Sequence, residues 1–407
     1  MLLQKSQVIE PGFARPWSPM GPGFHSSLVP LDTRHLSIHE STMISICTMG
    51  SLFYHSITAS VKLFIEICLP VSSASLAGTR VVLRQVSPES EAIYDLIIGL
   101  YKHIKGDFKS VNASEDDLSA FLSYAAQFLG NAGNYKSFGD SKFVPRLSEE
   151  KFKAIAAATP ELESLYEKAR KGIFAGESEG LLHLGYPSDG HLSTYYPESQ
   201  GITKEEISIV SDFLEGKKLL PENTRVRKTA DGFDVLIASA EVKPSDVDIP
   251  EKEWTIEDGE LKGKKVKLVF GDHSVEMGKI ADAIENAGKN AANDTQVKMH
   301  QEYAKSFRTG SLQAYKESQR FWIRDKKPMV ETDIGFVETY RDPHAIRGEW
   351  EGFVAMVNQE RTKAFGALVE AAPSLIPKLP WDKEFEKDKF LSPDFTSLEV
   401  LTFAGSG

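Results

Sequence analysis

Residues 320–358 read RFWIRDKKPMVETDIGFVETYRDPHAIRGEWEGFVAMVN and contain the densest set of polar side chains in the sequence. A strand-like run, Ile334–Thr339, leads into the polar cluster Glu338–Pro343, and a second cluster, Arg347–Glu351, follows closely. The pair Asp342-Pro343 within the first cluster is typical of a turn. The stretch therefore predicts a strand that ends in a turn lined by charged side chains.

Two side chains of this stretch, Glu338 and Tyr340, stand two positions apart, and on a strand such residues point to the same face. A carboxylate and a phenol on one face can hold an ammonium group and donate a hydrogen bond to a carbonyl oxygen. Glu349 and Glu351 would also share a face if the chain is extended there, and they would add a second source of carboxylate. The pattern is compatible with a small binding site.

The same cluster has a purely structural alternative. Arg341 and Arg347 lie among these acids in the sequence, and charged clusters in proteins are mostly solvated ion pairs at the surface. On residue types alone, this alternative is favoured over a binding site.

A second cluster is the segment Gly133–Asp140, which reads GNYKSFGD. Its two glycines, its Asn and its Ser predict a tightly turned loop, and such loops often line functional sites. Phe138 within it has two interpretations: it lines a site, or it anchors the loop in the core. The loop by itself is weak support for function.

Over the whole chain, the sequence predicts helices in its earlier part and strands mostly in its later part. Helices are predicted to begin at cap-like residues, namely Ser87, Ser114, Ser148, Thr159, Thr203 and near Ser274. Strands are predicted over Thr224–Arg227, Phe233–Ala238, Val266–Phe270, Ile334–Thr339 and Leu398–Phe403. Residues 241–264 are polar and acidic and predict a surface loop. This order favours an α+β fold over a regular βαβ series.

The first segment, Met1–Ala74, differs from the rest of the chain because it is rich in Ser, Pro and Met and shows no sustained period. Its most apolar stretch, Met43–Leu69, is interrupted by polar and charged residues, which disfavours a transmembrane helix. We interpret residues 1–75 as an atypical extension, either disordered or the product of a gene-model error. The patterned chain is expected to start near Leu76.

The composition excludes some classes of function. The formal net charge is −11 and the pI is about 5.5, which disfavours a broad grip on nucleic acid because phosphates need Lys and Arg. Both cysteines, Cys47 and Cys68, lie in the first segment, so the rest of the chain has no disulfide framework and no thiolate zinc site. A cytoplasmic setting fits this cysteine content, and the sequence leaves the oligomeric state open.

Short catalytic motifs are missing from the sequence. It contains no Walker A motif, no G-x-S-x-G elbow and no G-x-G-x-x-G fingerprint. None of its ten histidines forms H-E-x-x-H or a version one residue longer: His39-Glu40 begins such a motif, but Met43 and Ile44 stand where the second His is needed. Two histidines on one helical face are what allow zinc to be held beside a catalytic Glu. We therefore predict no metal site in this chain.

Three long stretches, in order, carry a resemblance to a known family. They are residues 133–147 (GNYKSFGDSKFVPRL), residues 320–358 quoted above, and residues 379–407 (LPWDKEFEKDKFLSPDFTSLEVLTFAGSG). Together they resemble the dipeptidyl peptidase III family of metallopeptidases. The resemblance implies a two-lobed, zinc-dependent hydrolase that removes dipeptides from the N-termini of short peptides, with a helical upper lobe that carries zinc and a lower lobe built around a small β-barrel.

The resemblance also implies a domain organisation. Residues 76–358 would belong to the lower lobe, with its helices and barrel. Residues 359–395 would be a helical segment directed toward the upper lobe, and residues 396–407 would be the start of a returning barrel strand.

Individual residues take on expected roles by the same resemblance. Glu338 matches the acid that holds the free amino group of the substrate, and Tyr340 matches the catalytic tyrosine that hydrogen-bonds the carbonyl region of the scissile bond. Glu351 matches another acid near the amino-terminal subsite, and Phe138 matches an aromatic that lines the cleft. The chain departs from the family pattern at His344-Ala345-Ile346, where an aromatic, a Gly and a small residue are expected.

Zinc is the cofactor that the resemblance implies for the full-length family, bound in an H-E-x-x-x-H helix that would lie beyond residue 407. We therefore expect a truncated chain that binds no zinc, keeps part of the substrate-binding lobe and is inactive as an isolated peptidase. Two alternatives stay open: a non-catalytic peptide-binding or interaction protein, and a metal-free hydrolase that uses Glu338 and Glu351 as an acid and base pair.

Overall fold

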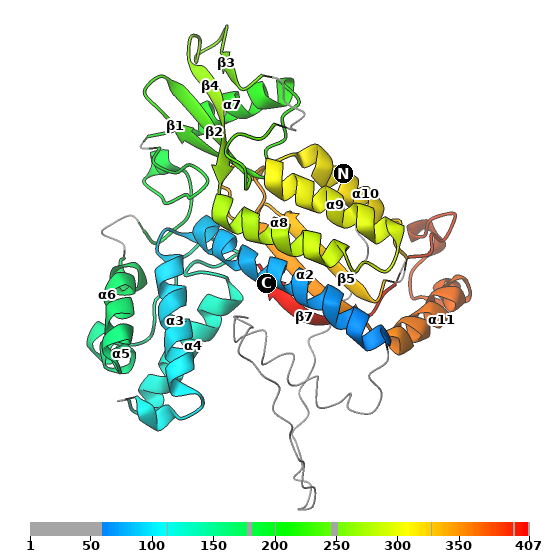
Figure 1. The fold of residues 1–407 in the computed structure, drawn as a ribbon, viewed down its shortest axis with the longest axis horizontal. Coiled ribbons are helices and arrows are strands. Elements are labelled where there is room, and N and C mark those ends of the chain that lie inside the picture. Colours follow the sequence, from blue (N-terminus) through cyan, green and yellow to red (C-terminus); the bar gives the residue numbers. More distant parts are fainter. Residues whose placement is uncertain are drawn as a thin grey trace, which may run out of the picture. The chain divides into compact units, whose positions relative to one another are not determined.

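The computed structural model describes residues 59–111, 113–176, 181–199, 201–245, 251–326, 328–393 and 395–405, with side chains from residue 66 onward (Figure 1). These residues divide into a larger unit, residues 65–326, 332–354 and 402–405, and a smaller unit, residues 59–64, 328–331 and 355–401. Helices and strands are both present, which confirms the predicted α+β class. Most of the first segment of the sequence lies outside the described residues.

The helix α2, Ala59–Val86, begins within the segment for which no period was predicted. The prediction that the pattern starts near Leu76 was therefore wrong for residues 59–75. A proline at position 70 and several serines hide the helical pattern in the sequence. The helix forms nevertheless, and its side chains Val71, Val82 and Val86 are fully buried in the larger unit, which indicates that tertiary burial rather than local propensity stabilises it.

A helical subregion of the larger unit follows α2. Its helices are α3 (Ser90–Ile104), α4 (Glu115–Gly130), α5 (Glu149–Ala156) and α6 (Pro160–Phe174). The predicted N-caps are confirmed for three of them, because the side chains of Ser114, Ser148 and Thr159 each accept a hydrogen bond from the first helical turn. A common core holds them together, and it includes Leu96, Phe121, Phe128, Phe152 and Tyr166.

The predicted cap at Ser87 was wrong. Helix α3 begins at Ser90 instead, and the Ser87 hydroxyl donates a hydrogen bond to the side-chain oxygen of Asn134 at 2.8 Å. The serine that resembled an N-cap in the sequence therefore bonds to a residue that is distant in the sequence.

A four-stranded sheet forms the second subregion of the larger unit. Its strands are β1 (Thr224–Lys228), β2 (Gly232–Ala238), β3 (Glu253–Thr255) and β4 (Lys265–Asp272), in the order β1-β2-β4-β3. Helix α7, Lys204–Gly216, packs its buried residues on this sheet and begins at a complete capping box around Thr203. Three of these strands were predicted, whereas β3 lies inside the segment predicted to be a loop.

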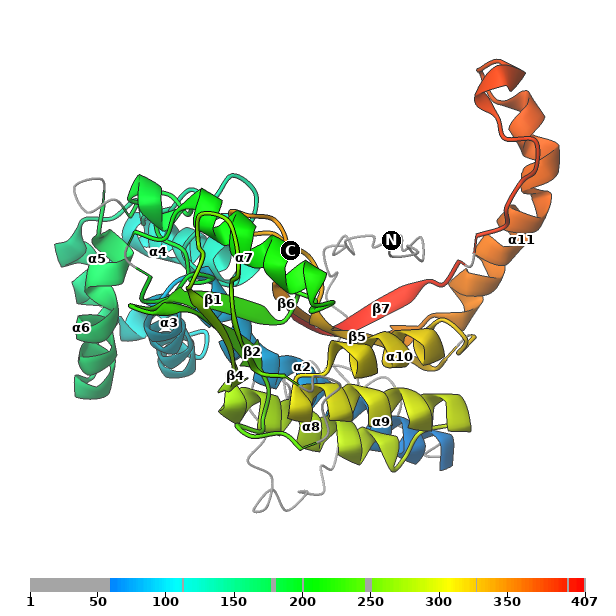
Figure 2. The same cartoon turned by 90° about the horizontal axis from the view of Figure 1, so that it is seen from above.

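Three helices that lie along one another form the third subregion: α8 (Ser274–Gly288), α9 (Asp294–Thr309) and α10 (Leu312–Trp322) (Figure 2). The start of α8 at Ser274 confirms the prediction, but α9 and α10 were not predicted. The buried side of α9 includes Gln296, His300 and Ser306, so its apolar period is broken by polar residues. Hydrophobic periodicity therefore could not reveal it.

A second sheet has the order β5-β6-β7, with strands β5 (Val330–Phe336), β6 (Trp350–Val357) and β7 (Leu398–Ala404). Strand β6 was not predicted. The described residues of these strands form an open sheet rather than a closed barrel. The predicted barrel is therefore not seen in the described ranges, whereas the mixture of helices and small sheets agrees with the prediction.

Helix α2 positions the start of β6 by two kinds of contact. The Gln85 side chain donates to the carbonyl of Gly348 at 2.9 Å and accepts from the amide of Trp350 at 2.7 Å. The Trp350 indole is fully buried against Gly78, where an added Cβ would lie 1.8 Å from the ring nitrogen. Only a glycine at position 78 leaves room for this ring, so helix and strand are fixed to each other next to Glu351.

The smaller unit contains helix α11, Gln359–Leu375, which Asn358 caps through a bond from the Arg361 amide. This helix lies where residues 359–395 were predicted to be helical. Two short 3-10 turns, Ile376–Lys378 and Lys383–Phe385, follow it. The assignment of the segment to a particular lobe stays a prediction.

None of the helices in the described part of the chain combines the length and the apolar character that crossing a membrane requires.

Candidate functional site

Glu338 and Tyr340 lie in the loop between β5 and β6, and Glu351 is the second residue of β6, all within the larger unit. Phe138 belongs to the same unit and lies in the loop after α4. The Val337 amide donates to the Glu349 carbonyl at 3.0 Å, and the Glu349 amide donates to the Glu338 carbonyl. Strand β5 ends at Phe336, so Glu338 and Tyr340 stand just beyond it and not on it. The predicted strand Ile334–Thr339 is therefore shifted toward the N-terminus, and the two-residue alternation of a strand does not explain where these side chains point.

The Asp342 carboxylate shapes this loop. It accepts hydrogen bonds from the amides of His344, Ile346 and Arg347 at 3.0–3.1 Å. Ala345 takes the left-handed backbone conformation, with φ of 56°. The resemblance led us to expect Gly at this position, and Ala carries a local backbone cost of about 1–2 kcal/mol there that Gly would avoid. The turn is formed in spite of the departure from that pattern.

Two guanidinium groups of the loop are buried without exposure to solvent. Arg341 pairs with Glu349 at 2.6 Å, and Arg347 lies 3.8 Å from Asp342; all four side chains are fully buried. The alternative of solvated surface ion pairs was therefore wrong about the environment, although it was right that these charges pair. A buried charge is strongly disfavoured without its partner, so each guanidinium keeps an acidic partner in the folded chain.

The Arg341 guanidinium also reaches the loop that carries Phe138. It donates to the carbonyl of Asn131 at 2.6 Å and to the carbonyl of Tyr135 at 3.2 Å. The Phe138 side chain is 76% exposed, and its ring centroid lies 5.7 Å from that of Tyr340 in an edge-to-face arrangement. Phe138 is thus not a core anchor. It stands at the surface beside Tyr340, and its role in lining a site stays a prediction.

Tyr340 and Glu351 form the centre of the cluster, and a hydrogen bond joins their side chains. Burial raises the pKa of the Glu351 carboxyl to about 7; the bond from Tyr340 opposes this rise, and the negative charges of Glu349, Asp333 and Glu338 add to it. Burial together with the charges of Glu351 and Glu338 raises the pKa of Tyr340 to about 12. At neutral pH the phenol is a hydrogen-bond donor, and Glu351 is near the midpoint of its titration.

The four residues singled out from the sequence are thus gathered in one place. Phe138 contacts Tyr340, Tyr340 bonds to Glu351, and the exposed Glu338 acts on both through its charge. The site faces solvent at Phe138 and Glu338 and is half-buried at Tyr340 and Glu351. Chemically, it offers carboxylates for a cation and a phenolic hydrogen beside them.

Two residues of the site were missed in the sequence. Burial, and after it the negative charges of Asp333 on β5 and of Glu351, raises the pKa of the Tyr315 phenol, and Asp333 also acts on Glu351. The Tyr315 ring lies over Gly335, where an added Cβ would be 2.4 Å from a ring carbon. A glycine inside a strand pattern signals such a close approach, so Gly335 was the signal that something packs on this part of the strand.

The described side chains do not form a set of ligands for a zinc ion. Within those ranges, no three or more His, Cys, Asp or Glu side chains are grouped so that they could hold a metal. His183 and His191 are neighbours, with ring centroids 6.2 Å apart, but they come without the further ligands that a tetrahedral zinc site requires.

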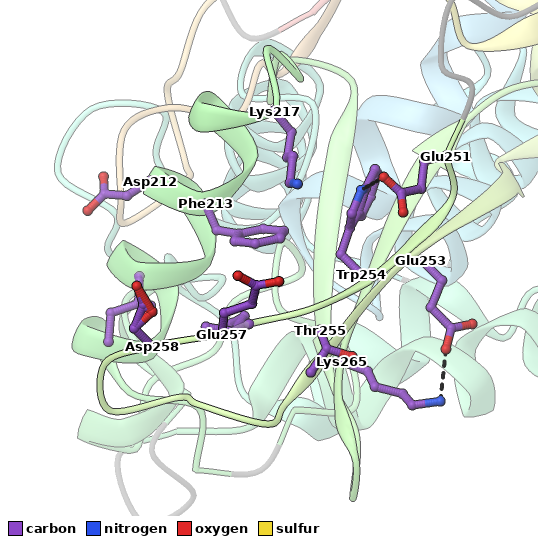
Figure 3. Close-up of a pocket in the computed structure, with 12 residues that line it drawn as sticks. Asp212, Phe213, Lys217, Glu251, Glu253, Trp254, Thr255, Glu257, Asp258 and Lys265 are labelled. Carbon is purple, nitrogen blue, oxygen red and sulfur yellow. Dashed lines mark hydrogen bonds and ion pairs between the residues drawn. The ribbon is translucent and has the colours of Figure 1, made fainter.

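A surface groove of about 920 Å³ lies elsewhere in the larger unit, between α7 and β3 (Figure 3). Phe213 and Trp254 meet edge-to-face in it, and the Lys217 ammonium lies 5.4 Å and 5.8 Å from their ring centroids. None of the four residues predicted from the sequence lines this groove. Its size alone does not make it the candidate site, because the pKa shifts and the convergent polar groups lie around Tyr340.

Comparison with known proteins identifies a family and several relatives that the chain resembles. Residues 165–407 match Peptidase family M49. The chain is 42% identical over 342 residues to dipeptidyl peptidase 3 of Dictyostelium discoideum, covering 83% of this chain and 48% of that protein. It is 40% identical over 354 residues to dipeptidyl peptidase 3 of Homo sapiens, covering 83% and 47%. The chain thus spans about half the length of the curated relatives it matches.

A solved structure shares the fold. The structure of DPP III from Caldithrix abyssi aligns with a TM-score of 0.51 at 15% identity, over 87% of this chain and 50% of that one. At this level of identity the likeness concerns the fold alone.

Proposed function

The chain belongs to Peptidase family M49, and from this premise we propose that the site around Tyr340 binds the free N-terminus of a short peptide for a dipeptidyl peptidase reaction. One observation carries the proposal. Phe138, from a distant loop, meets Tyr340, which in turn bonds to a half-buried Glu351 whose pKa lies near neutrality. Carboxylates in such surroundings favour a cation, and a peptide N-terminus is a cation at neutral pH.

Glu338 and Glu351 would share the ammonium group of the peptide. Glu338 is exposed and can meet the peptide first, whereas Glu351 is half-buried and close to other negative charges. An ammonium placed between them would neutralise this charge and favour the ionised form of Glu351. A peptide with a blocked N-terminus would bring no such charge, which accounts physically for a preference for chain ends.

Tyr340 would act on the carbonyl that lies beyond the ammonium. Its phenol keeps its proton at neutral pH because its pKa is about 12. Once an ammonium takes the place of the phenol as the partner of Glu351, the phenolic hydrogen is free to be donated to a peptide carbonyl. A donor placed where negative charge develops on a carbonyl oxygen stabilises the transition state by about 3 kcal/mol.

The wider organisation is also proposed by analogy with the family. We infer that residues 76–358 are lower-lobe material, that residues 359–395 extend toward an upper lobe, and that residues 396–407 return as a barrel strand. The zinc implied by the family would be held by an H-E-x-x-x-H motif, which the printed sequence does not contain. We therefore propose that this chain by itself binds peptides and does not cut them.

We expect Glu338→Gln to weaken the binding of tetra-alanine with a free N-terminus about tenfold, or ~1.4 kcal/mol, because an amide does not neutralise the ammonium group. The dissociation constant is measured by NMR titration of the full chain. Glu260→Gln, an exposed glutamate elsewhere in the larger unit, serves as the matched control and should leave the affinity unchanged. Equal binding of free and N-acetylated tetra-alanine to the unmutated chain would contradict the proposal.

The pH dependence of binding follows from the pKa of Glu351. The ammonium favours the ionised carboxylate, so affinity should rise as the pH increases through about 7. Above pH 8 the peptide amine loses its own proton, so the affinity should fall again. We expect a roughly fivefold gain between pH 6 and pH 7.5, and a maximum between about pH 7 and 8, in the same titration. In Glu351→Gln the gain below pH 7.5 should vanish; a persistent gain would assign the titration to another group.

A further inference from the structure

We propose that Arg341 is a positioning residue, which holds the Phe138 ring against Tyr340 and thereby sets the affinity of the site for peptides. The effect on affinity rests on the function proposed above, whereas the effect on Phe138 does not.

Arg341 lies at the junction of two segments that are distant in the sequence. Through one nitrogen its guanidinium bonds to the carboxylate of Glu349, and through the other it bonds to the carbonyls of Asn131 and Tyr135. Arg341 directly follows Tyr340, and Glu349 precedes Glu351 by two residues on the way into β6. One buried side chain thus joins the Tyr340 segment, the start of β6 and the loop that carries Phe138.

The connection continues from Asn131 to Phe138. The Asn131 side-chain oxygen accepts hydrogen bonds from the Ser137 amide at 3.0 Å and from the Ser137 hydroxyl at 3.2 Å. Ser137 is the residue before Phe138. The Phe138 side chain is mostly exposed, so its own burial contributes little to holding it in place. Its position beside Tyr340 therefore depends on the backbone that Arg341 and Asn131 fix.

The geometry of the guanidinium group makes arginine better suited to position 341 than lysine. Arg presents a rigid planar fork with several donors, whereas Lys presents a single compact ammonium. A lysine at position 341 would keep the charge that Glu349 needs, but its single nitrogen would replace the two nitrogens by which Arg341 reaches Glu349 and the backbone carbonyls separately. The change Arg341→Lys thus separates the pairing of charges from the positioning of the loop.

Arg347 provides a matched comparison in the same loop. It is also fully buried and carries the same charge, but its side chain contacts the Tyr196 hydroxyl at 3.1 Å and the Asp342 carboxylate. Neither partner belongs to the loop of Phe138. A general effect of losing a buried guanidinium should therefore appear in Arg347→Lys, while an effect on Phe138 should appear only in Arg341→Lys.

The first experiment follows Phe138 without any peptide. 4-Fluorophenylalanine is incorporated at position 138 of the full chain, and its fluorine NMR signal reports the packing against Tyr340. We expect Arg341→Lys, and also Asn131→Ala, to move this signal toward that of the free amino acid, while Arg347→Lys leaves it in place. Asn131→Ala keeps every buried charge, so it tests the connection even if Arg341→Lys fails to fold. An unmoved signal in Asn131→Ala and in folded Arg341→Lys would overturn the proposal.

The second experiment is a double-mutant cycle on the affinity for tetra-alanine. We expect Arg341→Lys to weaken binding roughly fivefold, since small displacements of positioning groups are costly, and to have no further effect in the Phe138→Ala background. Equal losses in both backgrounds would overturn a role through Phe138. If Glu338→Gln leaves the affinity unchanged but the fluorine signal moves as expected, the proposed function fails and the positioning of Phe138 stands.

Discussion

We expect Trp350→Ala to lower the free energy of unfolding by about 3–5 kcal/mol, the range for removing a large aromatic from a well-packed core. Trp350 is fully buried, and its ring packs against Phe307 and Phe336 with centroid distances of 5.5 Å and 5.4 Å. The rigid backbone of α2 at Gly78 lies on the ring as well. The cavity left by alanine cannot collapse easily, because a helix and a strand form its walls.

The loss is measured by urea denaturation followed by circular dichroism. Trp381→Ala is the control, because Trp381 is half-exposed in the smaller unit, and we expect its effect to stay within about 1 kcal/mol. Equal losses in the two variants would show that Trp350 does not hold α2 and β6 together. Since Glu351 is the next residue on β6, the Trp350 variant should also lose the affinity for peptides that the site provides.

Glu349→Leu is expected to destabilise the chain by about 3–5 kcal/mol, because it leaves the guanidinium of Arg341 buried without its carboxylate. The two side chains are fully buried and 2.6 Å apart. The free energy of unfolding is obtained from the same urea titration. Glu351→Gln, two residues further along the strand, is the control: its carboxyl already has a raised pKa, so a neutral amide there should leave the stability unchanged or raise it.

The double variant Glu349→Leu with Arg341→Met tests the cause of this loss. Replacing both members of a buried ion pair by apolar residues is often close to neutral, whereas removing one member is not. We therefore expect the double variant to be more stable than Glu349→Leu by about 2 kcal/mol or more. A double variant that is less stable than the single one would show that the bonds of Arg341 to backbone carbonyls outweigh the burial of its charge.

Local signals in the sequence predicted the parts of the fold that depend on local contacts. The caps at Ser114, Thr159 and Thr203 were found because a capping side chain bonds to an amide only two or three residues away. The strands β1, β2 and β4 were found because their short runs contain residues that favour strands, such as Val226, Val235 and Val266. Helix α9 was missed because its buried face includes the polar residues Gln296 and His300. Strand β6 was missed because its first residues, Trp350 and Glu351, were counted with a charged cluster.

The sequence by itself determined which side chains are available at the site. The residues Glu338, Tyr340 and Glu351 stand close together in the chain, and the long motifs around them carried the resemblance to a peptidase family that the comparison of residues 165–407 supports. A motif specifies residue types and their order, which are properties of the chain. It does not specify burial, and so it could not distinguish solvated ion pairs from the buried pair of Arg341 and Glu349.

Tertiary structure alone decided the environment of those side chains. Phe138 meets Tyr340 because a buried guanidinium bonds across to a distant loop. The pKa of Glu351 rises to about 7 because neighbouring elements bury the carboxyl and bring other negative charges close to it. Desolvation and charge interactions act through space and depend on distance rather than on sequence separation. Glu351, an ordinary acid in the sequence, is therefore a half-protonated group at neutral pH only in the folded chain.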